Sequence, residues 1–432
     1  MAREASESDT DSDPESATAR DDSSATASLP GPDSLATDRS FLDDALAAAD
    51  AVGFVAVGGR FDADLRYLTG LDLSAGSSAY VRTAGTEVLC APSGPAERVA
   101  ERFDGRVATD RLGDPIGVRA AAALDGLLGD GAGGTVLVPA TIPHDAAVYL
   151  ERAGYELQST TAVETARATK APDEVAAIRG VQRAAAAGLR RAERVLAAAE
   201  NSETDGQRDQ PSPLRREDEP LTVERLRRAV NAELADYGVL SGGNTEVSVG
   251  TDASLAGLTR PDGATGPTVP ERPLSRGELI RVTVAPRGPH GYHGALTRTL
   301  VVDSDGGWER RAHVAVDSAL DAALSVIEPG ATPATVAREA DAELAAFGFD
   351  PTSGAEDGSA APLTSVYGVG LERREAPTLD ENTDLEAGMV VVVAPGVCDA
   401  ERGCIRLGDL VVVTDDGGDL LVDASRSFVP QK

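Results

Sequence analysis

Residues 367–379 read YGVGLERREAPTL, and this stretch decides how the rest of the chain is interpreted. Glycines alternate with apolar residues over 368–371, and a charged run then leads into Glu375-Ala376-Pro377. Short apolar runs bounded by Gly, Asp or Pro lie on both sides and predict strands. They cover residues 279–285, 297–302, 389–395 and 409–414. Two helices are expected between these runs, over 313–327 and 335–347.

The part of the chain before residue 166 has a different pattern. Residues 1–38 form a Ser/Asp/Ala/Thr mixture that predicts a disordered acidic tail, because it offers too little apolar surface to offset the entropy of ordering. Strand-like runs then alternate with amphipathic segments over 39–165, which predicts an α/β domain. The strands are expected at 53–58, 79–83, 87–91 and 135–140, and the helices at 41–49, 96–103, 116–128 and 145–153.

A second domain is expected over 166–432, and it opens on a long helix near Pro172. Proline suits a first helical turn, and the acidic residues Asp173 and Glu174 suit the positive end of the helix dipole. Residues at three- and four-residue steps predict one core-facing stripe. They are Val175, Ile178, Gln182, Ala185, Leu189, Ala192 and Leu196. Residues 200–221 break every periodicity and predict a solvated insertion before a helix at 222–237.

The chain is strongly acidic, with 40 basic against 71 acidic residues and a formal charge of −31. Lys170 and Lys432 are its only lysines. Such a surface is typical of a protein soluble in molar salt, where self-repulsion is screened, so we expect an extremely halophilic source. An ordinary acidic cytosolic protein is the alternative. The charge argues against nucleic acid or an anionic membrane as a partner.

Cysteine and hydropathy patterns predict a cytoplasmic protein. The three cysteines give no disulfide framework in a chain of this length. Cys398 and Cys404 could approach one another across a turn, but we expect buried thiols. No apolar run approaches 18 residues, and the amino terminus lacks the pattern of a secretory signal.

Residues 367–379 resemble the HGVGLE-x-HEAP signature of the pita-bread metallopeptidases, which include methionine aminopeptidase, prolidase, aminopeptidase P and creatinase. Tyr367 and Arg374 stand where that signature has its two histidines, a metal ligand and a substrate contact. RYLTG at 66–70 and K-x-P-x-E at 170–174 resemble further motifs of the family, in the same order. The resemblance implies an α/β protein with a creatinase-type N-terminal domain and a pita-bread α+β C-terminal domain.

The same resemblance implies the positions of a two-metal centre. The family holds its metals with two Asp, one His and two Glu, which are hard oxygen ligands and an imidazole. The five corresponding positions are Thr283 or Val284, Ala295, Tyr367, Ala394 and Gly408. A substrate-contacting histidine of the family corresponds to Gly257. None of these residues supplies a carboxylate or imidazole, so we expect no metal, no cofactor and no catalytic residue.

Several remaining side chains are candidates for binding a ligand in the former metal cleft. Arg298, Arg374 and Arg406 are expected near it, and an Arg in a partly desolvated cleft favours carboxylates or phosphates. Pairing of these arginines with nearby Asp and Glu is the alternative. Tyr292 and His293 are further candidates, although such residues are more often simple turn or surface groups.

We therefore expect a divergent, non-catalytic homologue of Xaa-Pro aminopeptidase or prolidase. Its cleft would bind a peptide, a small anion or a protein partner. Two alternatives remain open: an active Xaa-Pro aminopeptidase or dipeptidase with unrecognised ligands, and a scaffold subunit paired with an active paralogue. A homodimer is a further possible assembly.

Overall fold

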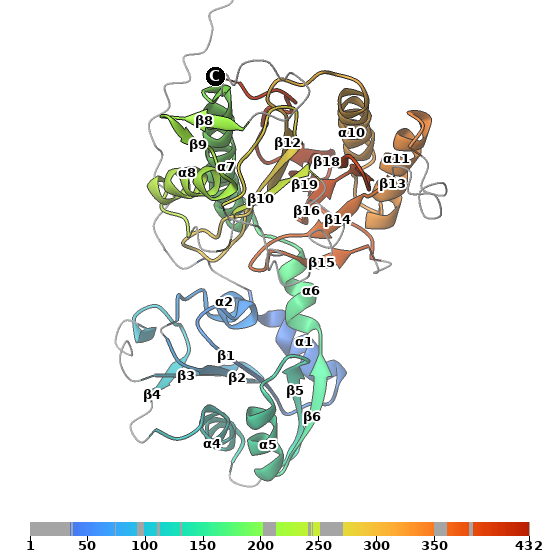
Figure 1. The fold of residues 1–432 in the computed structure, drawn as a ribbon. Helices are drawn as coiled ribbons and strands as arrows, with labels where there is room; N and C mark the ends of the chain where they lie inside the picture. The colour runs from blue at the N-terminus through green and yellow to red at the C-terminus, as the bar shows by residue number, and fades with distance from the viewer. Residues whose placement is uncertain are drawn as a thin grey trace, which may run out of the picture.

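The computed structural model describes Leu35 and residues 38–431, except 74, 93–98, 110–112, 130–131, 202–212, 241–242, 244, 251–270, 350–360 and 380–382. Gly257 and the expected disordered tail, apart from Leu35 and Asp38, lie outside these residues. The chain forms two lobes, with the amino-terminal part in one and the rest in the other (Figure 1). The helix α6 (Ala162–Ala168) runs between them.

The amino-terminal lobe is a six-stranded mixed sheet with helices packed on it, in the order β4-β3-β2-β1-β5-β6. β1 pairs antiparallel with β2 and parallel with β5. The strands are β1 (Gly53–Gly58), β2 (Ser78–Thr83), β3 (Thr86–Ala91), β4 (Arg106–Thr109), β5 (Gly134–Pro139) and β6 (Tyr155–Thr160). The helices are α1 (Ser40–Ala48), α2 (Ala63–Thr69), α4 (Ile116–Leu128) and α5 (His144–Arg152).

The four strands expected in this lobe are confirmed, as are three of its four expected helices. Both faces of the central strands are buried, so these strands are apolar along most of their length and could be recognised as short continuous apolar runs. The helix expected over 96–103 begins among residues that are not described, and only Val99 and Ala100 of it are helical.

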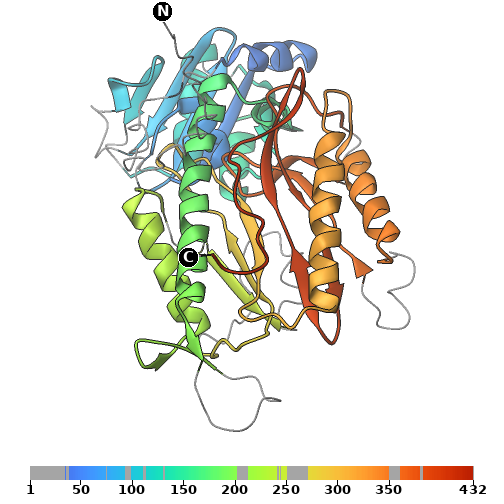
Figure 2. The same cartoon turned by 90° about the horizontal axis from the view of Figure 1, so that it is seen from above.

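The carboxy-terminal lobe contains three sheets between two pairs of helices. Figure 2 shows the green helices α7 and α8 on one side of the strands and the orange helices α10 and α11 on the other. These helices are α7 (Pro172–Ala197), α8 (Val223–Asp236), α10 (Trp308–Ser325) and α11 (Pro333–Ala346). The α/β fold class expected from the sequence is confirmed.

The strand order in the three sheets is β10-β11-β12, β13-β17-β18 and β15-β14-β16-β19-β20. The first sheet consists of β10 (Thr245–Val249), β11 (Ile280–Val284) and β12 (Leu296–Leu300). The second consists of β13 (Ala361–Pro362), β17 (Gly396–Asp399) and β18 (Gly403–Arg406). The third consists of β14 (Ser365–Gly368), β15 (Glu375–Thr378), β16 (Val390–Ala394), β19 (Asp409–Thr414) and β20 (Gly417–Leu420).

Helix α7 anchors the first sheet to the rest of the lobe. Pro172 is its first residue, and the Glu174 carboxylate accepts from the Ala171 amide at 2.7 Å, which caps the helix start. The predicted stripe faces inward from Ile178 to Leu196. One face of β10-β11-β12 packs on this helix and on α8, so the opposite face of the sheet is directed toward the centre of the lobe.

The expected solvated insertion over 200–221 is partly ordered. Its described ends form a small antiparallel ribbon of β7 (Glu200–Asn201), β8 (Leu214–Arg216) and β9 (Glu219–Pro220). Leu214 and Leu221 are buried in the core beside α7 and α8. These two apolar residues, on either side of a polar turn, therefore anchor the segment to the core. The polar composition of the segment did not indicate this contact.

The expectation of buried thiols at Cys398 and Cys404 is wrong, because the two residues form a disulfide. They stand directly opposite each other on the paired strands β17 and β18, with Cα atoms 4.1 Å apart. A cross-strand pair brings two Cβ atoms within reach of an S–S bond, and spacing along the chain alone cannot reveal that register. Cys90 is a free, buried thiol.

Candidate functional site

Four of the expected metal-ligand positions or their neighbours meet at the centre of the carboxy-terminal lobe. The Thr283 and Thr297 hydroxyl oxygens lie 3.1 Å apart on paired strands β11 and β12. Gly408 exchanges backbone hydrogen bonds with Thr297, at 2.9 and 3.0 Å. A Cβ atom added to Gly408 would lie 3.1 Å from the Ala394 Cβ and 3.3 Å from the Thr297 Cβ. Resemblance and geometry thus place Thr283, Ala394 and Gly408 at one point.

The register of β11 decides between the two candidates for the first aspartate position. Val284 is fully buried in the core formed with α7 and α8, on the other face of the sheet. Thr283 faces the centre and contacts Thr297. Of the two candidates, Thr283 is therefore the one whose side chain faces the centre of the lobe.

The remaining two positions, Ala295 and Tyr367, border the same centre. Both are partly buried against the apolar cluster that contains Ala394. The amide and carbonyl of Ala295 both bond to the Gln182 side chain, each at 2.8 Å. Tyr367 pairs with Val392 between β14 and β16. Their side chains offer a methyl group and a phenol to this space.

The residues present do not fit the two divalent metals that the family resemblance implies. Hydroxyl, methyl, glycine and phenol groups supply neither the anionic oxygens nor the imidazole of such a centre. Across the described residues, no three His, Cys, Asp or Glu side chains gather closely enough to hold a metal ion. No chemical step is therefore derived through a metal here.

Arg298 is buried and fully engaged in contacts within the protein interior. Its side chain is fully buried, and its Nη2 donates to the Asp409 carboxylate at 2.7 Å. The other nitrogen atoms donate to the backbone carbonyls of Thr297, Gly408, Ala424 and Ser425. These bonds occupy the guanidinium, so Arg298 is not part of the site proposed below.

The charge of Arg374, which is exposed, lowers the pKa of Arg406, so the two side chains lie near one another; their role in binding a ligand stays a prediction. The Arg374 guanidinium stacks on the Tyr367 ring, 4.9 Å from its centroid. Arg406 is 5% exposed, and burial lowers its pKa to about 10. Tyr367 raises that pKa, whereas the positive charges of Arg281 and Arg374 lower it further. Two of the three candidate arginines are therefore neighbours.

Tyr292 and His293 are buried supports beside the domain junction. The Tyr292 hydroxyl donates to the Glu174 carboxylate, and its ring lies in the apolar core. Burial, followed by the charges of Arg287 and Arg373, lowers the pKa of His293 to about 4, so this imidazole is neutral. Its Nδ1 is enclosed without a hydrogen-bond partner among the described residues.

A buried ion-pair network at the lobe junction was not predicted. Glu375 accepts from Lys170 Nζ and from Arg167 Nη2, each at 2.7 Å. Arg167 also binds Asp64 of α2 at 2.7 Å and the exposed Glu372 at 2.9 Å. Burial raises the pKa of Glu375, but Lys170 and Arg167 together hold it below the usual value. Lys170 lies in the K-x-P-x-E motif and Glu375 in residues 367–379, so the two family motifs were the sequence signal that could have indicated this pair.

The glycines of residues 367–379 make room for that network. A Cβ atom on Gly370 would lie 2.1 Å from the Glu375 Oε1, and one on Gly368 would lie 2.1 Å from the Ala376 carbonyl oxygen. Both glycines therefore allow β15 and its carboxylate to approach β14. This part of the motif serves packing.

Comparison with known proteins agrees with the architecture. The profile of metallopeptidase family M24 matches residues 176–415, more than half of the chain. The Xaa-Pro dipeptidase of Pyrococcus furiosus is 27% identical over 161 residues, which cover 37% of this chain and 44% of the dipeptidase. The matched region is thus less than half the length of that curated relative.

Solved structures share the whole fold. The prolidase from Pyrococcus horikoshii OT3 superposes with a TM-score of 0.72 at 17% identity and covers 90% of this chain and 99% of its own. The N-terminal domain of the FACT complex subunit SPT16 from chickpea (Cicer arietinum) gives 0.66 at 14% identity, covering 91% and 96%. At such identities the similarity establishes the fold alone.

Fold and strand order define a protein of the pita-bread peptidase class. The chain belongs to metallopeptidase family M24. In the described residues, no helix is long and apolar enough to cross a membrane.

Proposed function

We propose that this member of family M24 is a non-catalytic homologue of Xaa-Pro aminopeptidases and prolidases that binds a small ligand at the altered centre. One observation carries the proposal: the positions that meet there are Thr283, Ala394 and Gly408, packed at contact distance. Gly408 has almost no room even for a methyl group beside Ala394. A catalytic dication needs several carboxylates at this point.

The electrostatics of the centre support the same proposal. Carboxylates held within a few ångström without cations repel one another and resist ionisation. Neutral groups avoid that cost. The nearby charges are those of Arg281, Arg374 and Arg406 together with one acidic residue, Glu246, and guanidinium groups bind anions and not metal cations.

A metal-loading experiment tests the proposal. The purified protein, in molar potassium chloride, is incubated with manganese, cobalt or zinc, desalted, and measured by elemental analysis and for hydrolysis of Ala-Pro and Xaa-Pro-peptides. We expect less than one equivalent of retained metal and no turnover. The Pyrococcus furiosus Xaa-Pro dipeptidase, treated identically, is the positive control. Stoichiometric metal together with turnover would overturn the proposal in favour of an active peptidase.

A further inference from the structure

One face of the sheet β10-β11-β12 is polar and is directed toward the altered centre. Paired residues of antiparallel strands project to the same face of a sheet, so the register groups six polar side chains. They are Glu246, Ser248, Arg281, Thr283, Thr297 and Thr299. The opposite face is apolar except for Thr245 and Arg298, and its apolar residues pack on α7 and α8.

Arg406 extends over this polar face from β18. Its backbone amide donates to the Thr299 hydroxyl at 2.9 Å, and that hydroxyl donates to the Arg406 carbonyl at 3.1 Å. Gly396 leaves room for the side-chain stem, because an added Cβ would lie 3.3 Å from the Arg406 Cγ. Arg406 also stands two residues before Gly408. Its charge also interacts with Tyr367, so the guanidinium lies near one of the expected ligand positions.

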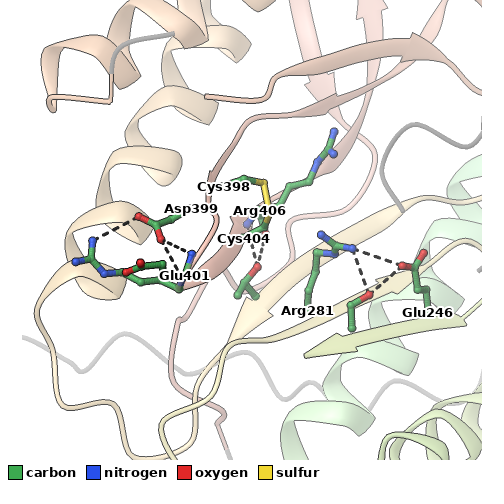
Figure 3. The surroundings of a disulfide bond; sticks show 10 residues. Glu246, Arg281, Cys398, Asp399, Glu401, Cys404 and Arg406 are labelled. Carbon is green, nitrogen blue, oxygen red and sulfur yellow. Dashed lines mark hydrogen bonds and ion pairs between the residues drawn. A yellow bond between two sulfur atoms is a disulfide. The ribbon is translucent and has the colours of Figure 1, made fainter. Parts of the chain in front are cut away.

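The Arg406 guanidinium has no hydrogen bond or ion pair with any residue in the described part of the chain. Figure 3 shows the contrast: dashed lines join Arg281 to Glu246, whereas none reaches the Arg406 guanidinium. Two other arginines with buried side chains, Arg298 and Arg167, each have a carboxylate at 2.7 Å. A buried cation without a partner destabilises the fold by several kcal/mol, so a bound anion that paired with Arg406 would be favourable.

The charges around Arg406 add to its need for a negatively charged partner. The positive charges of Arg281 and Arg374 lower the pKa of Arg406, and the carboxylate of Glu246 raises it. Glu246 is already paired with Arg281 at 3.5 Å. Arg406 therefore has two further guanidinium groups close by, on a chain whose formal charge is −31. The centre is locally positive.

We propose that Arg406, with Arg281 and Arg374, binds the oxyanion of a small ligand where relatives bind metal cations, and that this oxyanion is the carboxylate of a short peptide. A guanidinium offers parallel N–H donors that match the two oxygens of a carboxylate. The site rests on the proposed function, because a metal centre would leave no place for an anion. Inorganic phosphate presents related oxygens and is the alternative source that the test separates.

Isothermal titration with Ala-Pro and with its carboxamide tests the site, in molar potassium chloride containing a metal chelator. We expect Ala-Pro to bind at least about tenfold more tightly than the amide, as a charged hydrogen bond predicts. Arg406→Met should abolish that preference. Arg402→Met is the matched control, since Arg402 lies on the same hairpin, is 56% exposed and pairs with Asp399. The control should bind as the unaltered protein does.

A second measurement keeps the proposal falsifiable if affinities are low. Without ligand, Arg406→Met should raise the Tm by about 2 to 4 °C, because it removes an unpaired buried charge. Ala-Pro should raise the Tm of the unaltered protein but not that of the variant. A fall in the Tm of ligand-free Arg406→Met would show a paired, structural arginine and overturn the site.

The remaining outcomes are distinct from one another. Equal affinities for Ala-Pro and its amide would reject the anion site and leave the non-catalytic proposal intact. Inorganic phosphate that binds more tightly than Ala-Pro and displaces it would reject the peptide carboxylate. Hydrolysis of Ala-Pro after metal loading would reject the proposed function itself.

Discussion

Glu375→Gln tests whether residues 367–379 stabilise the fold independently of any chemistry. The Glu375 side chain is 3% exposed and lies between Lys170 and Arg167. Arg167 keeps two other carboxylates in the variant, but Lys170 keeps only the Ala168 carbonyl, at 2.9 Å. Leaving one buried cation uncompensated costs about 3 to 5 kcal/mol.

This free energy converts into a measurable melting shift. Unfolding entropy is about 2.1 cal/mol/K per residue near 60 °C, or about 0.9 kcal/mol/K for this chain. The Tm of Glu375→Gln should therefore fall by about 3 to 5 °C in molar potassium chloride, followed by circular dichroism. Lys170→Met with Glu375→Gln should lose less stability than the two single variants added together.

Glu372→Gln provides the matched control. Glu372 binds the same Arg167, at 2.9 Å, but its side chain is 54% exposed. Exposed ion pairs contribute about 0 to 1 kcal/mol, so the control should shift the Tm by about 1 °C or less. Equal shifts in the two variants would refute the argument that burial makes Glu375 essential to the fold.

Three further predictions address the centre, a buried imidazole and the surface. Gly408→Ala should cost about 1 to 3 kcal/mol by overpacking against Ala394, and adding Ala394→Gly should recover part of that loss in urea unfolding. The pKa of His293 is about 4 in the folded protein against 6.5 in the unfolded chain, so about 3 kcal/mol of the free energy of unfolding is lost as the pH falls from 6.5 to 4. His293→Phe should therefore make the free energy of unfolding less dependent on pH in that range. The charge of −31 predicts a Tm that rises between about 0.1 and 2 M potassium chloride, and a constant or falling Tm would contradict the halophilic interpretation.

Periodicity and short motifs predicted most of the architecture. The stripe from Ile178 to Leu196 is buried as expected, and the apolar run at β1 forms a strand with the expected bounds, Gly53–Gly58. These features depend on neighbours within a few residues in the chain. Local patterns carry that information.

The features that sequence reasoning missed depend on register between distant strands. Cys398 meets Cys404 only because β17 and β18 pair without an offset. Arg298 meets Asp409 because β12 lies beside the start of β19, which removed it from the candidate site. A one-residue shift would have sent each side chain to the other face, and composition does not encode that choice.

The same strands carry two kinds of position, and on our proposal this explains how the motif can stand beside a centre that binds no metal. Gly370 and Glu375 belong to the packing set, since a Cβ or a lost carboxylate there disturbs the junction of the lobes. Gly408 and Ala394 face the centre, where a Cβ atom added to Gly408 would lie 3.1 Å from the Ala394 Cβ. Arg406 stands between these sets, anchored by its backbone to Thr299 yet without a partner for its charge. On our proposal an anionic ligand supplies that partner and neutralises the Arg406 guanidinium.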